Sequence, residues 1–205
     1  MRKIRFIFLL AVITAVGVCS GIASADVIWN TFGPGDVFDG TQGSAIFSAQ
    51  TMANQFTVSG NDYLFDELEF PASVNYGTNL LNVSLRADNS GAPGSIIESF
   101  LVSGLPTDIA GIRSVNSALH PTLQSGTSYW IVMAPGASDS SGCWPKNWGL
   151  SGTVAYGPGS SWTVGEDYAN IFRVSGSAVV PEPSSLMAMF AGLGSLGGIL
   201  RRRRR

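Results

Sequence analysis

Short runs in which apolar and polar residues alternate constrain the fold of this chain more than any other feature. Within residues 80–86, Val83 and Leu85 alternate with polar neighbours, and Leu68 and Phe70 alternate with two glutamates. A period of two is typical of a β-strand, in which every second side chain points to the same face. No stretch of the body shows a capped helical period, so we expect no helix between these runs.

Turn sequences separate the runs along the whole body. Glycine, proline, asparagine and aspartate supply the backbone conformations that reverse a chain. They occur together at residues 33–35, 59–62, 88–91, 93–94, 125–126 and 157–159. Many short strands joined by such turns predict an all-β fold, an antiparallel β-sandwich of jelly-roll type.

One run near the middle of the body is apolar on both faces. Tyr129, Ile131 and Met133 share one face, and Trp130 and Val132 share the other. A strand with a single buried face would alternate between apolar and polar residues. We therefore predict that this strand is covered on both sides.

Charge divides the chain into three segments. Residues 1–25 carry three basic and no acidic residues, residues 26–180 carry thirteen acidic and four basic residues, and residues 181–205 carry one glutamate and five arginines. Segments that differ so strongly are expected to meet different environments. The acidic body has no basic stripe to replace the counterions of a phosphate backbone, so nucleic acid is excluded as a partner.

The N-terminus has the organisation of a secretory signal peptide. A basic start is followed by an apolar run at residues 6–18, and Ala23 and Ala25 occupy the positions that signal peptidase reads. Cleavage is predicted between Ala25 and Asp26, so that residues 1–25 are removed. The mature chain is therefore expected to be exported.

Removal of the signal peptide leaves one cysteine. Cys19 is lost with the signal, and Cys143 then has no partner for an internal disulfide. A lone thiol of this kind is typical of a small buried apolar residue. The alternative, a lipoprotein signal ending at Cys19, needs a small residue before the cysteine, and Val18 is there instead.

Residues 179–205 form the C-terminal segment of the chain. Pro181, Glu182 and Pro183 are followed by an uncharged span at residues 184–200. Five arginines end the chain: Arg201, Arg202, Arg203, Arg204 and Arg205. The seventeen residues of the span would form a helix about 26 Å long, the lower limit for crossing the apolar core of a bilayer. We predict a single short transmembrane helix whose arginines stay on the cytoplasmic side, with the body outside the inner membrane.

This order of Pro-Glu-Pro, apolar span and arginine cluster resembles the PEP-CTERM sorting signal of Gram-negative bacteria. The resemblance implies that exosortase, a membrane-embedded cysteine protease, recognises Pro181, Glu182 and Pro183 and removes the span. It also implies a bacterium that makes exopolysaccharide and biofilm matrix. The chain then divides into a signal peptide at 1–25, an exported sandwich at 26–178 and a sorting segment at 179–205, which contacts the inner membrane only transiently.

Two motifs in the body carry a second resemblance. Residues 91–94 form a G-x-P-G turn, and residues 123–130 read L-x-x-G-T-x-Y-W. Both are similar to motifs of the exported sandwich domains called choice-of-anchor domains. The resemblance implies a fold and a surface location, and it implies no reaction.

The residues that usually carry chemistry are sparse. His120 is the only histidine, no G-x-S-x-G turn accompanies it, and it has no clustered spacing with Cys143 for zinc. Three pairs of residues with side-chain oxygens are candidates for a structural calcium, although none fits the twelve-residue calcium loop: Asp36 with Asp39, Asp62 with Asp66, and Asp88 with Asn89. We therefore predict no catalytic residue and no other cofactor.

A stretch expected to be a loop offers candidate carbohydrate contacts. Trp144 and Trp148 could stack against sugar rings while Lys146 forms hydrogen bonds with hydroxyls. The alternative is that both tryptophans fill the open ends of the sandwich.

The sequence thus leaves three functions open. The first is a non-enzymatic cell-surface or matrix protein that acts through adhesion or bulk. The second is a carbohydrate-binding module for the matrix exopolysaccharide. The third and least supported is a glycoside hydrolase, whose paired carboxylates the sequence alone does not identify.

Overall fold

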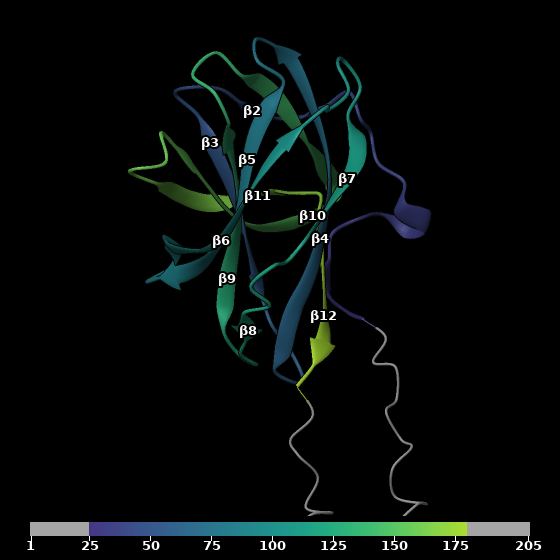
Figure 1. The fold of residues 1–205 in the computed structure, drawn as a ribbon, viewed down its shortest axis with the longest axis vertical. Helices are drawn as coiled ribbons and strands as arrows, with labels where there is room; N and C mark the ends of the chain where they lie inside the picture. The colour runs from purple at the N-terminus through teal and green to yellow at the C-terminus, as the bar shows by residue number, and fades with distance from the viewer. Residues whose placement is uncertain (1–24, 180–205) are drawn as a thin grey trace, which may run out of the picture.

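Twelve strands and one 3-10 turn, η1 (Pro34–Asp36), make up residues 25–179, the part of the chain that the computed structural model describes (Figure 1). The strands are β1 (Asp26–Asn30), β2 (Gly43–Ile46), β3 (Thr51–Thr57), β4 (Tyr63–Tyr76), β5 (Leu80–Asn89), β6 (Ala92–Ser103), β7 (Gly111–Asn116), β8 (Thr122–Leu123), β9 (Ser128–Pro135), β10 (Ser141–Gly157), β11 (Thr163–Asn170) and β12 (Arg173–Ala178). The predicted signal peptide, Pro-Glu-Pro motif, apolar span and arginine cluster lie outside the described residues.

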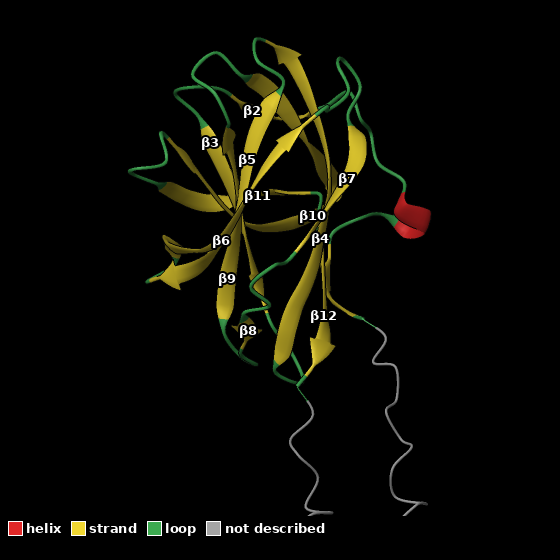
Figure 2. Ribbon diagram, in the orientation of Figure 1, coloured by secondary structure: helices red, strands yellow, loops and turns green. Residues whose placement is uncertain are grey.

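The strands pack as two layers (Figure 2). One layer contains β1, β12 and β4, and β7 and β8 also pair with β4; the other runs β3-β9-β5-β6. The long strand β10 joins them, because residues 141–143 pair with β4 and residues 154–157 pair with β3; residues 142–145 also pair with β2. Every pairing is antiparallel. The predicted all-β antiparallel class is confirmed, and the arrangement is consistent with a sandwich.

The main core lies between the two layers. The alternating residues Leu68, Phe70, Val83 and Leu85 are all fully buried, as their period predicts. Phe172, which precedes β12, packs edge-on against Phe56 of β3 with their ring centroids 6.1 Å apart. Each such apolar side chain contributes about 1.5–3 kcal/mol when it leaves water. These contacts hold the layers together.

Strand β9 is buried on both faces, which confirms the prediction for this run. Tyr129, Ile131 and Met133 point into the main core. Trp130 and Val132 point the other way, into a second cluster with two alanines from β3 and β10. Trp162, in the turn between β10 and β11, packs over this second cluster.

The two ends of the described chain lie at the same pole of the sandwich. Asp26 of β1 is opposite Gly176 of β12, and Ala178 at the end of β12 is opposite Tyr63 at the start of β4. Strand β4 has fourteen residues and ends at Tyr76, about 43 Å from Tyr63 at a rise of about 3.3 Å per residue. The end of β4 therefore marks the distal pole, the end of the sandwich away from both termini (Figure 1). Among residues 25–179, no helix has the length and apolar character that a membrane span requires.

Candidate functional site

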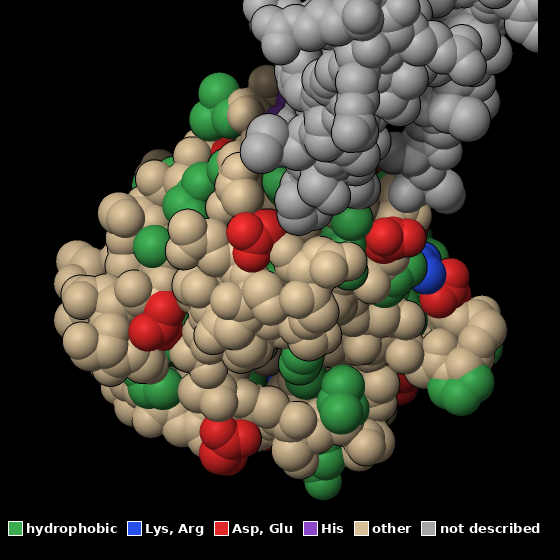
Figure 3. Space-filling view, turned by 90° about the horizontal axis from the view of Figure 1, so that it is seen from below, with side chains coloured by type: hydrophobic (Ala, Val, Ile, Leu, Met, Phe, Trp, Pro, Cys, Tyr) green, Lys and Arg blue, Asp and Glu red, His purple; other side chains and the backbone are tan. Residues whose placement is uncertain are grey.

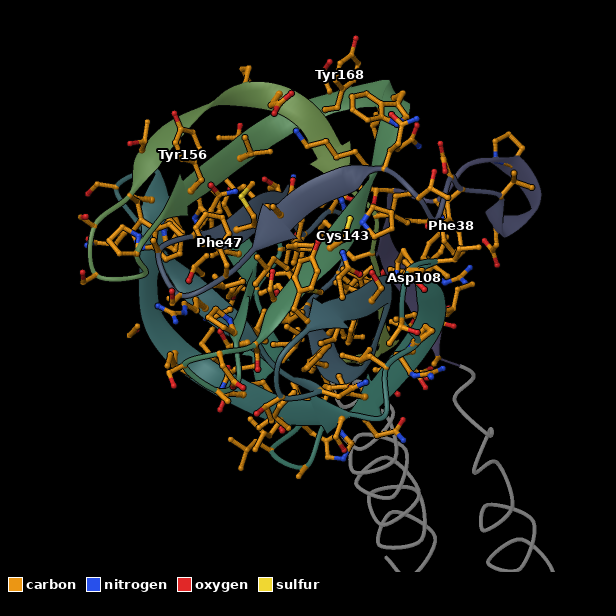
Figure 4. The ribbon with its side chains drawn as sticks, turned by 90° about the horizontal axis from the view of Figure 1, so that it is seen from above. Phe38, Phe47, Asp108, Cys143, Tyr156 and Tyr168 are labelled. Atoms are coloured by element: carbon orange, nitrogen blue, oxygen red, sulfur yellow. The ribbon has the colours of Figure 1, made fainter. Side chains whose placement is uncertain are left out.

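A pocket of about 390 Å³ opens at the distal pole. Its lining comes from β2 and the loop before it, the end of β4 and the first part of β10. It includes Thr41, Gln42, Asn75, Tyr76, Cys143 and Trp148. Figure 4 looks down on this pole and shows Cys143 among the strands that converge there. We call this feature the distal pocket.

Close contact between backbones forms the inner wall of the distal pocket. Ser141, Gly142 and Cys143 of β10 pair with the end of β4. A Cβ atom on Gly142 would overlap the carbonyl oxygen of Ser73. Glycine is therefore required where β10 meets β4, because only a residue without a side chain lets the two backbones approach this closely.

Trp148 is the large aromatic side chain that β10 contributes to the distal pocket. Its side chain is 48% exposed, and its ring packs edge-on against Tyr168 of β11 with centroids 5.1 Å apart. The Lys146 ammonium lies 6.0 Å from the centre of the Trp148 ring. The surrounding contacts fix the ring while leaving about half of it open to solvent.

Lys146 is not available as a free cation. Its Nζ lies 2.5 Å from Oδ2 of Asp167, and its side chain is only 14% exposed. The hydrogen bond from Lys146 lowers the pKa of the Asp167 carboxyl below its ordinary value, and the positive charge adds to that effect despite the opposing influence of burial. The pair is therefore ionised and internally neutral. This leaves Lys146 positioned to stack on Trp148 rather than to bind an external anion.

Trp144 does not face the distal pocket, so its prediction as a carbohydrate contact is wrong. Its side chain is fully buried and packs against Phe172, with centroids 6.1 Å apart. Its Nε1 donates a hydrogen bond of 2.7 Å to the carbonyl oxygen of Ile171. The stretch expected to be a loop is part of β10, and this strand turns Trp144 into the core.

The residues that line the distal pocket opposite β10 were not predicted from the sequence. Tyr76 is 73% exposed at the end of β4, and Asn75 and the loop residues Thr41 and Gln42 lie nearby in the lining. The only local signal is a tyrosine beside the turn residue Gly77, which has a φ of 71°. That signal predicts the end of a strand, but it does not predict that this end lies beside β10, whose residues are more than sixty positions later in the chain.

Cys143 lines the distal pocket as a half-buried free thiol. Burial raises its pKa, and the negative charge of Asp39 raises it further. The thiolate is the nucleophilic form of cysteine, so this environment disfavours reactivity. The interpretation of Cys143 as an unreactive apolar residue fits its surroundings.

His120 is part of a structural hydrogen-bond group. Its Nδ1 lies 3.0 Å from Oδ1 of Asp66, whose Oδ2 accepts a hydrogen bond of 2.5 Å from the Ser177 hydroxyl. In a catalytic triad the serine hydroxyl would contact the imidazole. Here it contacts the carboxylate instead, so the group ties the end of β12 to β4.

The aspartates predicted as possible calcium ligands accept hydrogen bonds from other residues of the body. Asp36 pairs with Arg173, Asp39 binds Thr41, and Asp88 accepts from Trp130. Asp62 accepts a hydrogen bond from the backbone of Ser125. Across residues 25–179 there is no group of three or more histidine, cysteine or acidic side chains placed to hold a metal ion.

Comparison with known proteins identifies the tail. Residues 179–205 match the family described as the PEP-CTERM protein-sorting motif. No curated protein matches the chain. The match confirms the resemblance drawn from Pro181, Glu182 and Pro183. It implies recognition by exosortase and export to the cell envelope, and it covers only the tail.

Proposed function

We propose that this chain is a non-enzymatic protein of the cell surface or extracellular matrix, delivered by signal peptidase and exosortase and linked to exopolysaccharide. The single observation that carries the proposal is the sorting motif at residues 179–205, which directly follows an all-β body. A signal peptide at 1–25, an apolar anchor at 184–200 and a matrix location are parts of the proposal.

The junction between body and motif supports this arrangement. The last strand ends at Ala178, and the amide of Val179 donates a hydrogen bond of 2.8 Å to the carbonyl oxygen of Asp62. The motif prolines begin two residues later, at Pro181. Two prolines separated by one residue keep a segment extended, which suits a chain that a protease must bind. Recognition would therefore take place close to the folded body.

The sorting proposal is tested by replacing Pro181, Glu182 and Pro183 together with alanine. We expect an uncut precursor that fractionates with the inner membrane, because exosortase no longer recognises the chain. Replacing Ser184 and Ser185 with alanine is the matched control and should leave processing intact. Cells lacking exosortase should give the same uncut precursor as the triple variant. Normal release of the triple variant would contradict the proposal.

Carbohydrate binding is the second candidate, and the distal pocket favours it over a purely bulk role. Two exposed aromatic side chains, Trp148 and Tyr76, lie in the lining of one pocket with hydroxyl and amide groups. Sugar rings combine apolar faces with many hydroxyls, and such a lining matches both. The carbohydrate candidate now rests on Trp148 and Tyr76, because Trp144 is buried.

A glycoside hydrolase receives the least support. That reaction needs two carboxyl groups about 5–10 Å apart on either side of the bond to be cut. The lining of the distal pocket contains no aspartate or glutamate.

A further inference from the structure

We infer that the distal pocket selects saccharides without negative charge, and that polymers of uronic acids or sulfated sugars are not its ligands. This inference rests on the carbohydrate candidate above and adds the chemical class of the ligand. Neutral hexoses and N-acylated amino sugars are the class it names.

The first argument is the composition of the lining. Thr41, Gln42, Asn75 and Ser141 contribute hydroxyl and amide groups, and no residue of the lining carries a charge. The side-chain Oδ1 of Asn75 accepts a hydrogen bond from the Ser73 hydroxyl. Within residues 25–179, the Asn75 NH₂ and the Gln42 side chain make no hydrogen bond to the protein. Amides of this kind can donate to and accept from hydroxyl or acetamido groups.

The second argument is the sign of the nearest charges. The Asp39 carboxylate accepts hydrogen bonds from the side chain and backbone of Thr41, and both lower its pKa below the ordinary value. Its negative charge also acts on the Cys143 thiol inside the distal pocket. Asp139 binds the backbone amide of Thr78, two residues after Tyr76. An anionic ligand would therefore enter against negative charge.

The third argument is that the basic residues of the body are paired or lie outside the lining. Lys146, the one beside Trp148, is paired with Asp167. Arg173 is paired with Asp36 and Glu69, and it lies outside the lining. Arg86 and Arg113 keep their charge, because they bind neutral oxygens of Ser84 and Gly104, but they too lie outside the lining. Acidic side chains are also spread over the opposite pole (Figure 3). A uronate chain would therefore find no cation in the lining of the distal pocket.

The fourth argument is exposure. Trp148 and Tyr76 are 48% and 73% exposed, so each ring has a free surface for the C–H face of a sugar. Aromatic rings in a pocket are the residues whose loss weakens binding most. The lining polar groups then fix the orientation of the sugar without a charged contact.

The test is affinity electrophoresis of the mature protein released from exosortase-positive cells. The gels contain dextran or glycol chitin as uncharged polymers, or alginate and dextran sulfate as anionic ones. We expect retardation by at least one uncharged polymer and none by the anionic ones. Trp148→Ala and Tyr76→Ala should each weaken the retardation about tenfold. Tyr156→Ala is the matched control, because Tyr156 is 47% exposed on β10 outside the lining.

Two further measurements distinguish loss of ring stacking from loss of the fold and locate the bound saccharide. Trp148→Tyr retains an aromatic ring, so it should keep most of the binding if stacking is the cause, and circular dichroism checks that each variant is folded. The bound saccharide should also slow alkylation of Cys143, the only cysteine of the mature chain, measured by mass spectrometry.

Retardation by alginate that depends on Trp148 would overturn the charge preference and leave the carbohydrate candidate standing. Absence of retardation by every polymer, or equal loss in Tyr156→Ala, would overturn both. Neither result bears on sorting, which the Pro-Glu-Pro variant tests separately.

Discussion

At the residue scale, Asp88 explains why two motifs separated by thirty residues belong together. Its Oδ1 accepts hydrogen bonds from Trp130 Nε1 at 2.7 Å and from Gln55 Nε2 at 2.9 Å, and its Oδ2 accepts one from the Gly91 amide at 2.9 Å. Gly91 has a φ of 85°, a conformation that favours glycine. The G-x-P-G turn and the tryptophan of the L-x-x-G-T-x-Y-W run are therefore joined through one carboxylate.

Replacing Asp88 with asparagine should lower stability in a pH-dependent way. Desolvation acts to raise the pKa of Asp88, but the hydrogen bonds from Gly91, Trp130 and Gln55 outweigh it and leave the pKa below 3.8. A lowered folded-state pKa adds stability that is present above the unfolded value and lost as the pH falls through the folded one. We expect Asp88→Asn to cost about 1 kcal/mol at pH 7. The difference from wild type should shrink below about pH 4, as thermal melts would show.

Asp108→Asn is the matched control for this prediction. Asp108 is exposed, and it makes no side-chain hydrogen bond with another residue in the range 25–179. Its φ of 67° is a conformation that asparagine tolerates. A gap between wild type and Asp88→Asn that stays constant from pH 7 to about pH 3 would contradict the assignment.

At the element scale, β10 and β12 depend on glycines where backbones approach closely. The register of β12 against β4 shifts between Ser175 and Gly176, and a Cβ on Gly176 would overlap the carbonyl oxygen of Leu64. Such an irregularity re-aims a strand while keeping it paired. Strand β12 is also the strand that leads into the sorting segment. Its pairing with β4 thus determines where the tail leaves the body.

Gly176→Ala should therefore destabilise the body by about 1–3 kcal/mol, because the backbone must move to admit the methyl group. Gly165→Ala on β11 is the matched control, since no atom lies within 4 Å of a Cβ there. It should change the free energy of unfolding by less than about 0.5 kcal/mol. Urea denaturation of both variants measures the difference. Equal stability of the two would show that β12 adapts without cost.

At the scale of the whole molecule, the two poles of the sandwich are separated by the length of β4. The termini leave beside Tyr63, and the distal pocket opens beside Tyr76. A chain held at the membrane by either end would thus present the distal pocket outward. If the proposed tether and the proposed carbohydrate site are both present, their placement at opposite poles would let a large polymer approach without meeting the membrane.

This geometry predicts that the point of attachment controls binding. Protein immobilised through the amino group of Asp26 should retain the binding of an uncharged polysaccharide that we propose for the free protein. Protein immobilised through a maleimide on Cys143, at a pH and coupling time that allow for the raised pKa of this thiol, should lose that binding, because the linker occupies the distal pocket. Surface plasmon resonance compares the two surfaces. Equal binding by both would place the ligand elsewhere on the body.

The sequence by itself determined the features that contiguous residues encode. Period-two runs such as residues 80–86 predict strands, because successive side chains of a strand point to opposite faces and the order of the residues therefore gives the composition of each face. The turns at Gly91 and Gly126 follow from the φ values that glycine permits. The sorting motif at 179–205 is a linear signal that another protein reads, so it needs no tertiary structure to be found.

Only the tertiary structure decided the candidate site. Trp144 and Trp148 are four residues apart and would share a face of a regular strand, yet one is buried and the other is 48% exposed. The reason is the register shift of β10 between Lys146 and Ser151, where the strand passes from one layer to the other. Likewise, long-range pairing brings Tyr76 to β10. Local patterns cannot encode such contacts, because they depend on which distant strands pair and in what register.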